Sequence, residues 1–104
     1  MIEMYILKLY VTGHTPRSER AIYNLYQLCD KYLTGNYQIT VIDVAEYPEI
    51  AEREKILATP TVIRELPLPR RRLVGDLSDA ERVISALDLK VSPVSRGAES
   101  VEGD

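Results

Sequence analysis

The stretch ILATPTVIREL, residues 56–66, places a proline between two threonines directly ahead of a short apolar run. An X-Pro bond is the one peptide bond that adopts the cis form at modest cost, so Pro60 at the entrance of a strand can form a built corner. The alternative is an ordinary trans proline at the first residue of a strand, where no ladder donor is lost. The local sequence favours the trans form, because only about 5% of X-Pro bonds in folded proteins are cis. The surrounding elements must decide between the two.

The composition of the chain fits one globular domain. Of its 104 residues, 45% are hydrophobic and 28% are charged; we assign residues 1–91 to the domain and the small, polar residues 92–104 to a disordered tail. A formal net charge of −3 argues against a nucleic-acid partner, which requires a basic surface. No apolar run approaches the roughly 18 residues of a membrane helix, so we expect a cytoplasmic protein without a membrane partner.

The sequence has one cysteine, Cys29, and one histidine, His14. A single cysteine forms no internal disulfide, and zinc sites usually combine several Cys and His ligands. Cys29 falls on the apolar positions of a predicted helix, which favours a packed thiol over a reactive one. We interpret His14 as a solvated turn residue, because no second catalytic group is evident. We therefore predict no metal, no cofactor and no catalytic residue.

Strand and helix signals follow one another without an internal repeat. Residues 4–11 are nearly all apolar, which suits a central strand buried on both faces. Further strands are expected at 37–44, after Pro60 and at 71–74, and helices from Pro16 to near Gly35, at 48–56 and within 77–89.

Two of the predicted helices have clear start signals. Thr15 can cap the first, with Pro16 at its first helical position, and the pattern S-x-x-E from Ser78 to Glu81 predicts a capping box at the last. The apolar face of the first helix is predicted to comprise Ile22, Leu25, Tyr26, Cys29 and Leu33. That of the last is predicted to comprise Ala80, Val83, Ile84 and Leu87.

The predicted order is β-α-β-α-β-β-α, which begins with a βαβ unit of parallel strands and ends with a hairpin and a helix. This is the order of the thioredoxin fold, an α/β fold whose members place a cis-proline before the third strand. The resemblance therefore favours a cis bond at Pro60. Thioredoxins carry CxxC at the turn after the first strand, but here that turn reads Gly13-His14-Thr15-Pro16. A thiol oxidoreductase is disfavoured because its nucleophile is missing, and we predict that the protein is not an enzyme.

Four motifs, in this order and spacing, are more specific: LKLYVTGHTPRS at 7–18, VIDV at 41–44, ILATPTVIRELPLPRRR at 56–72 and GDLSDAE at 75–81. Over about residues 4–89 the chain resembles the KaiB family of circadian clock proteins. The resemblance implies a non-enzymatic regulator that binds the ATPase ring of a KaiC-type protein, sequesters KaiA and displaces a SasA-type histidine kinase. The alternative is a KaiB-like adaptor in stress or two-component signalling without an oscillator.

KaiB proteins are also metamorphic. The resemblance implies an alternative ground state, a homo-oligomer of four or two chains, in which the C-terminal half is rearranged. It assigns the fold switch to Pro60, Pro67, Pro69 and Ala86. At the position of Ala86, cyanobacterial relatives tend to have glycine.

The resemblance also assigns partner-binding residues. It places the end of the first helix and an edge strand with Tyr37, Gln38 and Thr40 against the ATPase ring. It assigns a basic patch to Arg20, Arg64, Arg71 and Arg72. The run from Arg70 to Arg72 has a second interpretation, a solvated hairpin that blunts a strand edge, which we weigh equally with recognition of an acidic partner.

Overall fold

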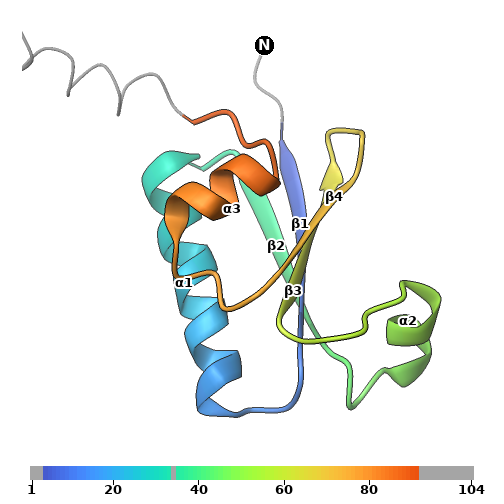
Figure 1. Cartoon of the computed structure of the whole chain (residues 1–104). Coiled ribbons are helices and arrows are strands. Elements are labelled where there is room, and N and C mark those ends of the chain that lie inside the picture. Colours follow the sequence, from blue (N-terminus) through green and yellow to red (C-terminus); the bar gives the residue numbers. More distant parts are fainter. Residues whose placement is uncertain (1–3, 34, 92–104) are drawn as a thin grey trace, which may run out of the picture.

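The computed structural model describes residues 4–33 and 35–91, and the predicted tail lies outside them. The described part has the predicted order of elements, so the α/β fold is confirmed (Figure 1). Its strands are β1 (Tyr5–Val11), β2 (Tyr37–Asp43), β3 (Thr61–Leu66) and β4 (Arg71–Val74), and its helices are α1 (Pro16–Tyr32), α2 (Pro48–Arg53) and α3 (Ala80–Ala86). No helix in this part is long and apolar enough to cross a membrane.

The four strands form one mixed sheet in the order β2-β1-β3-β4. β1 pairs in parallel with β2, from Tyr5 opposite Tyr37 to Val11 opposite Asp43. β3 lies antiparallel to both β1 and β4. β2 and β4 are therefore the two opposite edges of the sheet, and the central position predicted for the first strand is confirmed.

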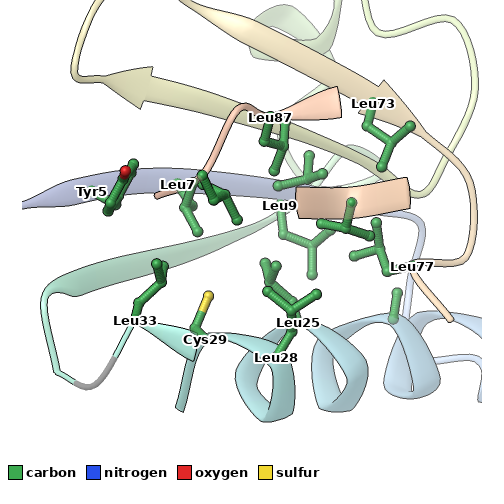
Figure 2. Packing of buried hydrophobic residues seen from close by; sticks show 14 of the residues in the cluster. Tyr5, Leu7, Leu9, Leu25, Leu28, Cys29, Leu33, Leu73, Leu77 and Leu87 are labelled. Carbon is green, nitrogen blue, oxygen red and sulfur yellow. The ribbon is translucent and has the colours of Figure 1, made fainter. Parts of the chain in front are cut away.

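The hydrophobic core lies between one face of the sheet and the helices α1 and α3 (Figure 2). Alternate residues of β1 point into it, because successive side chains of a strand face opposite sides. From β1 these are Tyr5, Leu7, Leu9 and Val11, met by Ala21, Leu25, Leu28, Cys29 and Leu33 from α1 and its end, and by Val83, Leu87 and Leu89 from α3 and beyond. α2 lies on the other side of the sheet (Figure 1).

The start of α1 is as predicted, and of its predicted apolar face Ile22, Leu25, Cys29 and Leu33 do pack in or against the core, whereas Tyr26 does not. Thr15 is the N-cap, its hydroxyl accepts a hydrogen bond from the Ser18 amide at 3.1 Å, and Pro16 is the first helical residue. Leu28 is buried, whereas Tyr26, predicted to lie in the core, is 39% exposed. Tyr26 was wrongly assigned because it lies at the margin of the apolar stripe, where its ring meets that of Tyr37, the first residue of β2.

The predicted capping box of α3 is wrong. The N-cap is Asp79, whose carboxylate accepts a hydrogen bond from the Arg82 amide at 3.2 Å. Ser78 instead donates both its amide and its hydroxyl to Asp76, at 3.1 and 2.9 Å, so its side chain is already engaged in a turn. Ala86, predicted to lie inside the helix, is its last residue.

The peptide bond before Pro60 is cis, as the resemblance to the thioredoxin fold predicts. The bonds before Pro67 and Pro69 are cis as well, which was not predicted. The carbonyl of Pro60 accepts a hydrogen bond from the Gly75 amide at 3.0 Å, which joins the start of β3 to the residue after β4.

Candidate partner-binding surfaces

The turn after β1 contains polar contacts and no thiol. Thr12 and Thr59 share a hydroxyl hydrogen bond of 2.7 Å, which places this turn beside the residue that precedes the cis-proline. The Gly13 amide donates to the Asp43 carboxylate at 2.9 Å, and this bond is the first cause of the lowered pKa of Asp43. The His14 side chain is 91% exposed, as expected of a solvated turn residue.

Cys29 is fully buried in the core and makes no disulfide. Burial in apolar surroundings, with a smaller contribution from the charge of Asp30, raises the pKa of this thiol to about 12. The thiolate is the reactive form of cysteine, so this residue is a structural thiol, as predicted.

The predicted ring-facing residues lie on the edge strand β2 but on two faces of the sheet. Tyr37 pairs with Tyr5 and so faces the α1 side, whereas Gln38 and Thr40 pair with Ile6 and Lys8 and face away from it. Within the part of the chain that the structure describes, β2 pairs with β1 alone, so its outer backbone groups have no ladder partner.

The Tyr37 side chain contacts two residues of α1 that the sequence interpretation did not assign to a binding surface: Asp30, which it did not single out, and Tyr26, which it placed on the apolar face of the helix. Its hydroxyl donates a hydrogen bond to the Asp30 carboxylate. This bond, with smaller effects of burial and of the Asp30 charge, raises the pKa of Tyr37 to about 12. The ring of Tyr26 meets that of Tyr37 edge to face, with centroids 6.5 Å apart. The spacing of Tyr26 and Asp30, four positions apart on one helical face, was the available signal.

We call this region the β2-edge surface, made of Tyr26, Asp30, Tyr37, Gln38 and Thr40. It combines the exposed Tyr26 ring and the half-buried Tyr37 ring with a strand edge that is free within the described residues. Both features are typical of protein-binding surfaces.

Arg64, predicted to belong to a basic patch, is not on the surface of this fold, because it is only 3% exposed. It pairs with Leu7 across the sheet and therefore points to the side of α1 and α3. Its guanidinium donates to the carbonyl of Asp88 at 3.0 Å and to that of Pro69 at 2.7 Å. Arg64 thus fastens β3 to two loops.

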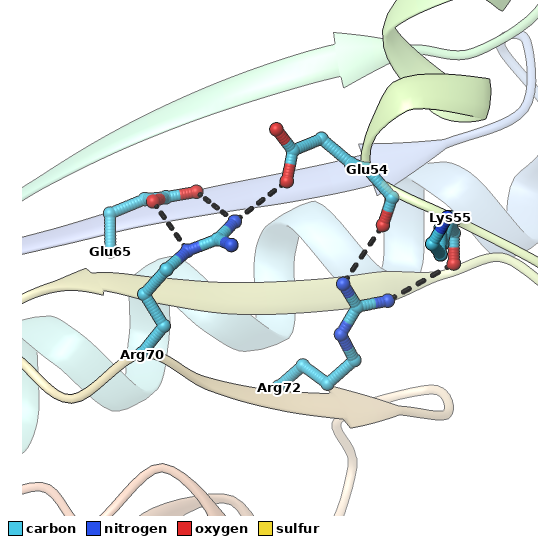
Figure 3. Close-up of polar contacts among 5 residues, drawn as sticks. All are labelled: Glu54, Lys55, Glu65, Arg70 and Arg72. Atoms are coloured by element: carbon cyan, nitrogen blue, oxygen red, sulfur yellow. Dashed lines mark hydrogen bonds and ion pairs between the residues drawn. The ribbon is translucent and has the colours of Figure 1, made fainter.

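Two of the three hairpin arginines are fastened to the end of α2 (Figure 3). Arg70 binds Glu65 at 2.9 and 3.0 Å and Glu54 at 2.7 Å. Arg72 donates to the carbonyls of Glu54 and Lys55 at 2.9 and 3.1 Å. The bond from Arg70 is the main cause of the lowered pKa of Glu54.

Arg71 and Arg20 are exposed. Among residues 4–33 and 35–91, neither side chain makes a hydrogen bond or an ion pair, although Arg20 lies close enough to Asp76 to help lower the pKa of that carboxylate. Arg71 lies on β4 and Arg20 on α1, so they come from different elements. We call Arg71 and Arg72 the β4-edge surface, which lies at the opposite edge of the sheet from the β2-edge surface.

Comparison with known proteins settles the family. The model of the KaiB domain matches residues 8–89. The chain belongs to the KaiB family. The circadian clock oscillator protein KaiB of Synechococcus elongatus is 54% identical over 85 residues, which cover 82% of this chain and 83% of that protein. KaiB proteins are non-enzymatic clock proteins, in agreement with the missing CxxC.

Solved structures confirm the thioredoxin-like fold of this KaiB homologue. The N-terminal domain of Synechococcus elongatus SasA matches with a TM-score of 0.70 and 23% identity, over 86% of this chain and 89% of that domain. Deadhead, a germline-specific thioredoxin of Drosophila melanogaster, matches with a TM-score of 0.62 and 20% identity, over 86% of this chain and 83% of that protein.

Proposed function

We propose that this KaiB homologue docks on the ATPase ring of a KaiC-type protein through the β2-edge surface. The observation that carries the proposal is that, within the described residues, the outer edge of β2 is unpaired and lies beside the exposed ring of Tyr26 and the half-buried ring of Tyr37. A SasA-type sensor domain, which shares the fold, would compete for the same face of the ring. The site of action is the cytoplasm.

The β4-edge surface is proposed to recognise a second, acidic partner of the KaiA type. Support comes from Arg71, an exposed cation that makes no ion pair with any residue the structure describes, and from the position of β4 at the opposite edge of the sheet. A chain that is docked by β2 leaves this edge free, so one copy can hold two partners at once. Arg20 on α1 is proposed to add to the same recognition by its charge.

The fold switch of the family is also carried over as a proposal. In the ground state the chain would form a homo-oligomer of two or four copies with a rearranged C-terminal half. Pro60, Pro67, Pro69 and Ala86 are the positions at which the two folds are proposed to differ. Ala86 ends α3, so its helix propensity counts for less than at an interior position.

The function is tested by measuring binding to a purified KaiC-type ATPase ring. We expect saturable binding by the unaltered chain and binding at least about tenfold weaker after Gln38→Glu with Thr40→Glu, because two carboxylates next to an edge must be desolvated on docking. Arg71→Ser, at the opposite edge, is the matched control and should bind the ring as the unaltered chain does. Absence of ring binding, with capture of a histidine kinase instead, would favour the adaptor function.

A further inference from the structure

The position of Asp30 is not explained by the helix that contains it. Asp30 lies in the last turn of α1, where the carbonyl end of the helix disfavours a negative charge. Aspartate is also one of the poorer helix formers. The neighbouring cation, Lys31, lies over the ring of Tyr32, 5.3 Å from its centroid. What Asp30 does gain is the hydrogen bond from Tyr37 on the next strand.

We propose that Asp30 is a positioning residue of the β2-edge surface, which holds the Tyr37 ring against Tyr26 so that the two rings form one preset anchor for the ATPase ring. The inference rests on the proposed function and adds to it the residue that sets the geometry of the docking face.

Two contacts fix the Tyr37 side chain from different directions. The hydroxyl is bound to Asp30 at its tip, and the ring is met on its side by Tyr26 at an interplanar angle of 68°. The rest of the ring packs partly against the core cluster, so few orientations remain. A side chain that is already ordered loses less conformational entropy when a partner binds, and tyrosine is enriched among residues that dominate binding.

A merely structural role for the hydrogen bond gives a different expectation. If Asp30 served only to join α1 to β2, its removal would lower the free energy of unfolding. Docking would then weaken only as far as the folded fraction of the chain decreases. Since an acid in the last turn is unfavourable for the helix itself, we expect Asp30→Ala to leave the melting temperature unchanged or raise it, while docking weakens.

The experiment compares binding of a purified KaiC-type ATPase ring by the full chain and five variants. Asp30→Ala and Tyr37→Phe should each weaken binding about fivefold, or roughly 1 kcal/mol. Asp30→Asn keeps a carbonyl oxygen that accepts from the Tyr37 hydroxyl and should restore most of the affinity. Glu52→Ala removes an exposed acid of α2, with the same change of charge, and should bind like the unaltered chain.

The double variant Asp30→Ala with Tyr37→Phe should bind the ring no more weakly than either single variant, because both substitutions remove the same hydrogen bond. Additive losses would overturn the inference, as would full affinity in Asp30→Ala while the unaltered chain binds. The inference would also be overturned if the binding free energy that Asp30→Ala loses equalled the unfolding free energy that it loses. Failure of the unaltered chain to bind the ring would overturn the proposed function, and this inference with it.

Discussion

The buried guanidinium of Arg64 donates to the main-chain carbonyl of Asp88 at 3.0 Å, which ties β3 to the chain that follows α3. A second bond, to Pro69 at 2.7 Å, ties it to the β3–β4 loop. In the described part of the chain Arg64 makes no ion pair, and both of its hydrogen bonds run to main-chain carbonyls. A planar, forked donor is needed to reach both carbonyls at once.

Arg64→Lys is therefore expected to destabilise the fold, because an ammonium group cannot reproduce both bonds. The free energy of unfolding should fall by about 1 to 2 kcal/mol, measured by urea denaturation. Arg71→Lys, on the opposite position of β4, is the control and should change it by less than about 0.5 kcal/mol. Equal stability of the two variants would show that the Arg64 contacts contribute nothing.

The ion pairs of Arg70 should give a pH-dependent contribution to stability. The pKa of Glu54 is lowered in the folded state, chiefly by its hydrogen bond to Arg70, so the stabilisation exists above its ordinary value of 4.5 and is lost as the pH falls below it. These groups are partly exposed, so Arg70→Ala should cost only about 0.5 to 1 kcal/mol at pH 7, and less at pH 3. Urea midpoints at both pH values check this, and a cost that grows at pH 3 would contradict the assignment.

Charge reversal separates the two proposed surfaces. Arg71→Glu should weaken binding of a KaiA-type protein by about tenfold and change ring affinity by less than about twofold, as measured by biolayer interferometry. Arg20→Glu should act in the same direction. Equal losses toward the ring and the KaiA-type partner would mean that the two edges do not act separately.

Cys29 should be chemically silent in the folded protein. Its pKa is raised from 9.0 to about 12 by burial, so little thiolate forms at pH 8, and alkylation by iodoacetamide should be at least about 100-fold slower than in urea. The same raised pKa means that its contribution to stability is complete below pH 9 and is lost as the pH rises toward 12. Insulin reduction should stay at background, and turnover that disappears in Cys29→Ser would contradict a structural thiol.

The sequence was sufficient for features that depend on neighbouring residues. The strands, the Thr15–Pro16 helix start and the element order all follow from local periodicity and capping chemistry. The cis bond at Pro60 required the fold resemblance in addition. The α3 cap was mispredicted because two aspartates flank Ser78. Asp76 accepts the hydrogen bonds of Ser78 and Asp79 caps the helix, and the local sequence pattern does not show which of these residues is the N-cap.

Features that depend on contacts between distant segments could not be predicted from local sequence patterns. In the sequence, Arg64 looks as much like an exposed cation as Arg71 does. It is a buried donor because the fold brings the carbonyls of Asp88 and Pro69 to its guanidinium. The proposed docking anchor likewise depends on contacts between Tyr37 on β2 and two residues of α1, Tyr26 and Asp30.

Amide hydrogen exchange of the full chain, with and without a KaiC-type ATPase ring, shows whether the β2-edge surface is the docking face. Docking by the β2-edge surface predicts slower exchange for the backbone amides of Tyr37–Asp43 and of the last turn of α1, with no change in Arg71–Val74. Slower exchange confined to Arg71–Val74, or unchanged exchange rates in β2 of a chain that binds the ring, would contradict docking by the β2-edge surface.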